Sequence, residues 1–431
     1  MRHSWRAAGA ALLMALTMGG AAAAGHSAET AHRHAAPRLN EAAVLDLDVD
    51  FYRRRVARDP LSARDEGELA RLYLQRGRQN ASEPDLRASE AHARRSLALR
   101  TGRNGATAQV LAGALMARHA FVQAREVAER LVTADSSSRA ARAMLGEIEL
   151  ELGDYAAARR TFGTLLTVRT DFVVAPRFAR WEELRGRPDA AEALFRGALT
   201  QASAHHGTPA SQLAWFHWRL GDLALRTGRL GAAHTELRLG LDAVPDDARL
   251  LGALARLAAV RHRWPEAITY GERSLARVVD PATLGLLSQA YAVVGDSARS
   301  ADAFKAMAVA VLNQPGPFHR GWSLLLLERG AEVPTVLARA RAELQTRRDV
   351  YGWDLLGWAL YRAGRSREAV DASGHALALG TRDAMLWYHA GMIRLAAGDS
   401  VAGRAALRTA IAINPHWDPF QPDSARAALA R

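Results

Sequence analysis

Three histidines near the N-terminus are the residues best suited to bind a metal ion. His26, His32 and His34 lie in GHSAETAHRHAAPRLN, residues 25–40. If cleavage makes His26 the third residue, its imidazole, the free amine and two amides form the square-planar set that suits Cu(II) or Ni(II). The same stretch is small, polar and Pro-containing, as disordered linkers are. The sequence therefore leaves two interpretations, a metal-binding tail and a plain polar linker.

A second group of potential ligands follows the linker. Asp46, Asp48 and Asp50 have the spacing that opens a calcium-binding loop. The sixth loop residue is then Phe51, where the loop needs Gly, and the twelfth is Ala57, where it needs Glu. This excludes an EF-hand. We expect instead that the three acids lie at the N-terminus of a leading helix over residues 41–60.

Motifs of catalysis are absent from the sequence. There is no HExxH, no GxSxG, no phosphate-binding loop and no G-x-G-x-x-G. The chain has no Cys, so no thiol nucleophile exists and no disulfide forms. His205 and His206 have no carboxylate partner at a recognisable spacing. We predict no catalytic residue, no cofactor and no enzymatic activity.

The dominant pattern is a short phrase that returns along most of the chain. Each copy has a small residue, a loop Gly seven positions later and a second small residue five positions after that. The second small residues are Ala124, Ala158, Ala191, Ala233, Ala267, Ser300, Thr335, Ala369 and Gly403. All the intervals but one are close to 34 residues, which is typical of stacked helical hairpins.

The clearest copy resembles the tetratricopeptide repeat (TPR) family. Its residues that match the family pattern are Trp353, Leu356, Gly357, Leu360, Gly364, Ala369 and Ala376. The resemblance covers roughly residues 62 to 415. It implies an all-α, right-handed superhelical solenoid of about ten helix-turn-helix hairpins, closed by a C-terminal capping helix.

Small residues recur because two antiparallel helices approach closely only where small side chains meet. Some copies depart from the pattern. In the first one we expect Ala91 and Ala98 at the inner positions of the second helix. In residues 317–348 the inner positions hold Thr335 and Arg339, and near Trp264 the loop Gly is replaced by His262.

The first residues have the pattern of a secretory signal peptide, with Arg2 and Arg6, a short apolar run and A-x-A cleavage sites. We therefore divide the chain into a signal peptide (1–24), a linker (25–40), a leading helix (41–60), an N-terminal array (61–200), an insert loop (201–211), a C-terminal array (212–416) and a capping helix (417–431). Without Cys a lipoprotein anchor is excluded. A secreted or periplasmic protein is expected, with an uncleaved N-terminal anchor as the alternative.

The formal charge is +12, which falls by two when Arg2 and Arg6 leave with the signal peptide. The arginines are scattered along outer helix faces rather than gathered beside aromatic platforms, so a nucleic-acid partner is not expected. Peripheral contact with an anionic envelope surface remains open, and so does the oligomeric state.

In the TPR family the first helix of each hairpin supplies the concave wall. Carrying its inner positions onto this chain predicts a partner-binding groove of aromatic and charged residues: Arg180, Trp215, Trp218, Asp222, Arg256, Tyr351, Asp354, Trp358, Tyr361, Tyr388 and Met392, with Glu183, Arg249 and Met385 at further inner positions. Aromatic anchors suit an extended peptide or an amphipathic helix. Packing between neighbouring repeats is the other interpretation of these aromatics.

The resemblance favours a non-catalytic interaction scaffold of the cell envelope that binds a peptide or a protein partner. The alternative is a periplasmic accessory protein that binds a small ligand or a metal ion through the tail histidines or the inner wall.

Overall fold

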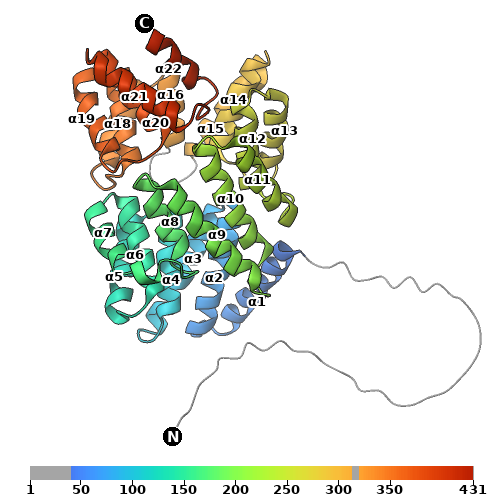
Figure 1. Cartoon of the computed structure of the whole chain (residues 1–431). Helices are drawn as coiled ribbons and strands as arrows, with labels where there is room; N and C mark the ends of the chain where they lie inside the picture. The colour runs from blue at the N-terminus through green and yellow to red at the C-terminus, as the bar shows by residue number, and fades with distance from the viewer. Residues whose placement is uncertain (1–39, 313–319, 431) are drawn as a thin grey trace, which may run out of the picture. The chain divides into compact units, whose positions relative to one another are not determined.

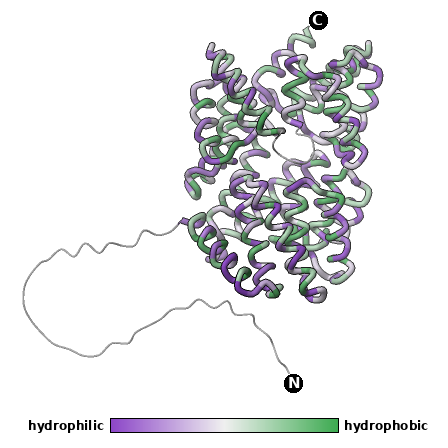
Figure 2. Tube along the Cα trace, turned by 180° about the vertical axis from the view of Figure 1, so that it is seen from behind, coloured by the Kyte–Doolittle hydropathy of each residue, from purple (hydrophilic) through white to green (hydrophobic). Residues whose placement is uncertain are grey.

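The computed structural model describes residues 40–312 and 320–430, and in these residues the fold is all-helical. The predicted signal peptide and the tail histidines His26, His32 and His34 lie outside the described residues. Residues 40–430 belong to one compact unit. Hydrophobic and hydrophilic residues alternate along its helices (Figure 2).

Helices α2 to α21 form ten consecutive hairpins within the described residues, which confirms the predicted solenoid (Figure 1). The two helices of each hairpin are neighbours in sequence and are packed against each other. The pairs are α2 (Ala63–Asn80) with α3 (Glu83–Leu99), α4 (Gly105–Ala117) with α5 (Phe121–Ala134), α6 (Arg139–Leu152) with α7 (Tyr155–Gly163), α8 (Ala175–Leu184) with α9 (Pro188–Ala204), α10 (Ala210–Arg226) with α11 (Leu230–Ala243), α12 (Ala248–Val260) with α13 (Trp264–Leu275), α14 (Pro281–Val293) with α15 (Ser297–Leu312), α16 (Arg320–Glu328) with α17 (Val333–Glu343), α18 (Val350–Arg362) with α19 (Ser366–Leu377) and α20 (Ala384–Ala396) with α21 (Ser400–Ile413).

Local signals in the sequence set the ends of these helices. The third hairpin shows how. Ser138 accepts a hydrogen bond from the Ala141 N–H at the start of α6, and Gly153 ends that helix with a φ of 78°. Asp154 then accepts from the Ala157 N–H and begins α7. Ser and Asp satisfy the free N–H groups of a helix start, and Gly adopts the left-handed conformation without strain.

Close contact within the hairpins depends on residues that lack a large side chain. A Cβ atom added to Gly221 would lie 2.6 Å from Leu237, and one added to Gly391 would lie 2.6 Å from Leu407. In the facing helices Ala158, Ala233 and Ala369 are fully buried. The steric explanation of the repeat therefore holds in these copies.

Two copies use a different register from the one predicted. In α3, Ala91 and Ala98 are exposed, whereas Ser89, Ala93 and Ser96 are buried. The Ser89 hydroxyl donates to the Ala70 carbonyl at 2.8 Å, so a serine occupies the place of the expected alanine. A small residue that can bond to the opposite backbone fits the contact as well as alanine does.

The second register difference lies in α17. There Val336 and Ala340 are buried, while Arg339 is exposed and Thr335 only partly buried. The inner positions are thus one residue later than predicted. Glu332 has a φ of 54° after Gly330 at 68°, so the turn contains two left-handed residues.

Single helices flank the hairpins. At the N-terminal end α1 (Glu41–Arg58) packs Leu45 and Val49 against α2. At the other end α22 (Gln421–Ala430) packs on α21. No helix in the described part of the chain has the length and apolar character needed to cross a membrane.

The prediction for the three acids of α1 was wrong. Asp46, Asp48 and Asp50 lie in the middle of the helix, and Asn40 is its N-cap. Asp46 instead pairs with Arg76 of α2 at 3.1 Å. Glu41, in the first turn, accepts hydrogen bonds from the Ala210 and Ser211 N–H groups at the start of α10.

Gly391→Ala should destabilise the fold, because the new Cβ would overlap Leu407 and lie 3.1 Å from the Gly403 carbonyl oxygen. Overpacking of this kind costs about 1–3 kcal/mol. Gly197→Ala is the matched control: Gly197 lies within α9 and a Cβ there meets nothing within 4 Å. That change should raise the free energy of unfolding by about 0.5–1 kcal/mol, because alanine favours a helix more than glycine does. Urea unfolding monitored by circular dichroism measures both. A Gly391→Ala variant as stable as the parent would contradict the packing argument.

Candidate functional site

Three hairpins near the middle of the chain are bonded to loops that come much later in the sequence. The Leu152 carbonyl at the end of α6 accepts from the Arg348 N–H at 2.8 Å. The Leu184 carbonyl at the end of α8 accepts from the Thr381 hydroxyl at 2.6 Å. The last carbonyls of a helix lack partners within the helix, so each loop supplies a cap that the helix needs.

The third contact of this kind involves Asn414. Its side-chain amide donates to the Leu225 and Arg226 carbonyls at the end of α10, each at 3.1 Å. We call these three contacts the inter-turn caps. The donors follow one another along the chain at the interval of the repeat, and the helices that they cap belong to three consecutive hairpins. The inter-turn caps therefore join one part of the superhelix to the part that follows it.

The turn glycines allow this contact because they adopt a left-handed conformation and because they have no side chain. Gly153, Gly186 and Gly228 have φ values of 78°, 69° and 75°. A Cβ on Gly186 would lie 2.2 Å from the Gly380 carbonyl oxygen, and one on Gly153 would lie 2.3 Å from the Arg348 carbonyl carbon. A side chain at these turns would be strained and would also collide with the opposite loop.

Charged side chains surround the first inter-turn cap. Arg347 donates to the Glu151 carbonyl at 2.9 Å and its guanidinium pairs with the Glu151 carboxylate. The Val350 N–H donates to the Tyr155 hydroxyl at 2.8 Å. These bonds fix the start of α18 against α6 and α7, and α18 carries four of the predicted groove residues.

Next to the second inter-turn cap, a cluster of arginines surrounds a buried carboxylate, at positions that the sequence predicts for the inner wall. Glu183 of α8 is 6% exposed and accepts from Arg180, Arg219 and Arg226 at 3.0, 2.7 and 2.7 Å. Burial by itself would raise the pKa of Glu183, but the three guanidiniums outweigh it and lower the pKa to about 2. The carboxylate is therefore ionised at any physiological pH.

A second carboxylate extends the cluster onto the neighbouring hairpins. Asp222 accepts from Arg226 at 3.1 Å and from Arg256 at 2.8 Å. Burial opposes its ionisation, yet the nearby arginines hold the pKa of Asp222 below its usual value. We call these six residues the arginine cluster: Arg180, Glu183, Arg219, Asp222, Arg226 and Arg256. Four guanidiniums face two carboxylates, so the cluster keeps an excess of positive charge.

Tyr351 connects the arginine cluster to the later hairpins. Its ring lies 5.8 Å from the Arg180 guanidinium, and its hydroxyl donates to Asp383 at 3.3 Å. Burial raises the pKa of Asp383. The structure thus brings together four predicted residues, Arg180, Asp222, Arg256 and Tyr351, although they come from four different helices.

Other predicted residues lie at a second place, in α18 and α20. Trp358 and Tyr388 are each 5% exposed, and Asp354 is 3% exposed. The Trp358 ring stacks on His389 at 4.1 Å and on Tyr361 at 4.8 Å. The contact with His389 is packing between neighbouring hairpins, and the contact with Tyr361 lies within α18. Tyr361 and Met392 remain partly exposed.

The remaining predicted aromatics, Trp215 and Trp218, are partly exposed on α10. Trp215 packs edge-on against Phe195 and Phe216, and the Arg219 guanidinium lies 5.6 Å from the Trp218 ring. Arg256 is the most accessible member of the arginine cluster, with 45% of its side chain exposed. A partner at the inner wall would therefore meet arginine and aromatic edges.

Sequence reasoning missed three residues of these sites. Arg219 and Arg226 were not in the predicted set, although both lie on α10 within a helical turn of Asp222. His389, which is 1% exposed, bonds to Asp354 at 2.9 Å. The spacing of Arg219, Asp222 and Arg226 on one helix face was a usable signal, because residues three and four apart are neighbours. Asp354 and His389 are 35 residues apart, close to one repeat, so the period places them on the first helices of adjacent hairpins, but no motif marks them as a bonded pair.

No family model matches the sequence, and no curated protein matches it. Solved structures similar in fold include three helical-repeat proteins. The Cut9–Hcn1 hetero-tetramer of the APC/C has a TM-score of 0.34 and 12% identity over 91% of this chain and 97% of that one. The type IV pilus biogenesis factor PilW has a TM-score of 0.40 and 21% identity over 52% and 99%. A tetratricopeptide repeat protein from Parabacteroides merdae has a TM-score of 0.35 and 14% identity over 60% and 97%. The likeness is too distant to carry an argument about function.

Gly186→Ala should be more destabilising than Gly364→Ala. Both glycines are left-handed, with φ of 69° and 75°, but a Cβ on Gly364 meets nothing within 4 Å. The control Gly364→Ala should lose only about 1–2 kcal/mol of stability, from the strain of a left-handed alanine. Gly186→Ala adds the collision with Gly380, about 1–3 kcal/mol more. Unfolding midpoints in urea give the difference. Equal losses in the two variants would contradict the proposed role of the inter-turn contact.

Acid should weaken the arginine cluster in a defined range. Folding lowers the pKa of Glu183 from 4.5 to about 2, so its stabilising contribution is complete above pH 4.5 and is lost as the pH falls through 2. Glu183→Gln cannot ionise, so the difference in unfolding free energy between parent and variant should shrink over this range. Asp371→Asn, at a side chain that is 84% exposed, is the control. Thermal melts at stepped pH measure both, and a constant difference for Glu183→Gln would oppose this account.

Proposed function

We propose that the protein is a non-catalytic interaction scaffold that holds an acidic segment of a protein partner against its inner wall. The observation that carries the proposal is the arginine cluster, in which four guanidiniums are held by only two carboxylates. Surplus positive charge on a partly exposed wall favours a negatively charged partner and discourages a positive one.

The fixed geometry of the wall supports this proposal. Glu183 and Asp222 each anchor more than one guanidinium, and the inter-turn caps fix α8 and α10 against the loops that follow them. A surface that is ordered before binding loses less side-chain entropy when a partner arrives. The adjacent Trp218 and Tyr351 add aromatic area with few rotatable bonds.

Export is part of the proposal. Residues 1–24 have the pattern of a signal peptide, so the mature scaffold would act in the periplasm or outside the cell.

The alternative role, binding of a small ligand or metal ion, has less support. The tail histidines lie outside the described residues. Within the described residues no group of three or more histidine, aspartate or glutamate side chains is arranged to hold a metal ion.

A photo-crosslinking amino acid at Arg256 should capture the partner from an envelope extract, because this side chain is the most accessible member of the arginine cluster. The same amino acid at Val401, which is 84% exposed on α21, should not capture it. Mass spectrometry identifies the crosslinked segment, which we expect to be rich in Asp and Glu.

A charge variant then measures the contribution of the wall. Arg256→Gln should weaken binding of that segment roughly tenfold, about 1.4 kcal/mol. Arg408→Gln, at an exposed arginine of α21, should leave it unchanged. Circular dichroism melts confirm that both variants are folded. Equal crosslinking from Arg256 and Val401 would oppose a binding site on the inner wall.

A further inference from the structure

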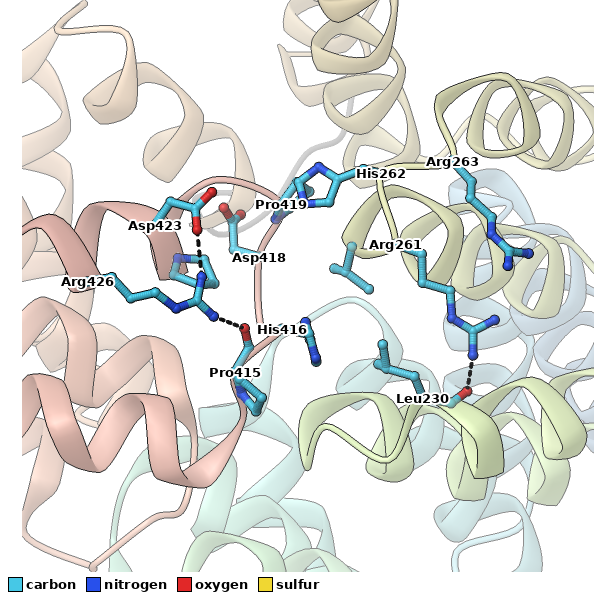
Figure 3. A pocket seen from close by; sticks show the side chains of 12 residues that line it. Leu230, Arg261, His262, Arg263, Pro415, His416, Asp418, Pro419, Asp423 and Arg426 are labelled. Carbon is cyan, nitrogen blue, oxygen red and sulfur yellow. Dashed lines mark hydrogen bonds and ion pairs between the residues drawn. The ribbon is translucent and has the colours of Figure 1, made fainter.

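Three consecutive hairpins have capped turns, and the turn of the next hairpin faces a cavity instead of a loop (Figure 3). Arg261, His262 and Arg263 form the turn between α12 and α13, at the place that Gly153, Gly186 and Gly228 occupy in the three preceding hairpins. A cavity of about 510 Å³ lies beside it. Its far side is formed by Pro415–Pro419 and the start of α22.

In the described part of the chain, the last carbonyl of α12 lacks the cap that the ends of α6, α8 and α10 receive. Val260 is the last residue of α12 and lines the cavity. Among the described residues no donor is bonded to its carbonyl oxygen, whereas the Leu152, Leu184 and Arg226 carbonyls each have one from a later loop. An extended segment laid along the cavity would supply N–H donors in the same manner.

His262 gives this turn a side chain where the three capped turns have glycine. It has a φ of 56°, and His119 in the turn between α4 and α5 has the same conformation with a φ of 57°. The imidazole lies at the edge of the cavity beside Pro419 (Figure 3). Trp264 stacks on Phe420 with ring centroids 5.7 Å apart and joins the two walls.

The lining carries charges of both signs. Its carboxylate Asp418 accepts hydrogen bonds from the Phe420 and Gln421 N–H groups, and burial raises the pKa of that carboxyl. Arg426 is neutralised by Asp423 at 2.5 Å, and Arg263 is 3.6 Å from Glu266. Arg261 donates to the Leu230 carbonyl at 2.9 Å and forms no ion pair among the described residues. A guanidinium that is held in place by a backbone bond and keeps its other N–H groups suits a carboxylate.

We propose that this cavity binds a short, extended, acidic segment of a protein partner, which caps α12 as the chain's own loops cap α6, α8 and α10. The segment's backbone N–H groups bond to the Val260 carbonyl, and an Asp or Glu pairs with Arg261. The cavity volume suits a few residues rather than a folded domain. This site is separate from the inner wall and does not depend on the function proposed above.

The test uses the full mature chain and a phage-displayed library of random short peptides as the probe. The selected sequences should be enriched in Asp and Glu. Synthetic copies of the best binders are then titrated by calorimetry against the parent chain and its variants. Arg261→Gln should weaken binding roughly tenfold, the loss of one charge-assisted bond.

Two further variants separate the cavity from other sites and from folding defects. His262→Gly restores the residue of the three capped turns, so it should keep the fold while weakening peptide binding by removing the imidazole. Arg408→Gln, at an exposed arginine of α21 that does not line the cavity, should leave binding unchanged. The proposal is overturned if no peptide is selected, or if the selected peptides bind Arg261→Gln and His262→Gly as tightly as the parent. It is also overturned if they lose affinity only in the inner-wall variant Arg256→Gln.

Discussion

Close approaches that glycine residues permit hold this structure together at two levels. Within a hairpin, Gly221 and Gly391 let one helix lie against leucines of the next. Between successive parts of the superhelix, Gly153 and Gly186 let a turn approach a later loop closely enough for hydrogen bonds to form.

The contacts between a turn and a later loop make the fold more cooperative. In a simple solenoid each repeat contacts only its neighbours, so stability is nearly a sum of local terms. Here bonds join residues 197 apart in the Leu184–Thr381 pair, and the loss of one repeat is felt in another far along the chain.

The inter-turn caps also explain why the arginine cluster can be so crowded. Bringing four guanidiniums together is unfavourable unless carboxylates and a rigid backbone hold them. Glu183 lies one residue before Leu184, whose carbonyl is capped by Thr381, and Asp222 lies in the last turns of α10, whose end is capped by Asn414. The anions of the cluster are thus positioned by the same helix ends that the later loops fix. The arginine cluster and the inter-turn caps therefore depend on the same helix ends.

The hairpins could be predicted from the sequence because their cause is local. A period near 34 residues and small residues at fixed places identify both helices of each pair, and the predicted solenoid is confirmed. The register failed in α3 and α17, because Ser89 replaces alanine through a hydrogen bond and Glu332 adds a left-handed residue to its turn. The inter-turn caps could not be predicted. They depend on small rotations that accumulate over several repeats, and no local feature of Thr381 or Asn414 points to the helix that it caps.

The candidate site could also be predicted only in part. Inner-wall positions carried from the TPR pattern found Arg180, Asp222, Arg256 and Tyr351, but the pattern could not tell which side chains the packing would use. Trp358 and Tyr388 are covered by neighbouring rings, while Arg256 remains largely open. The difference follows from chemistry. A large apolar ring lowers its free energy by packing against another ring, whereas a guanidinium keeps its hydration by extending past the carboxylate that holds it. Where both kinds of residue share a wall, the aromatics therefore tend to become core and the arginines remain at the surface, where the proposed partner would meet them.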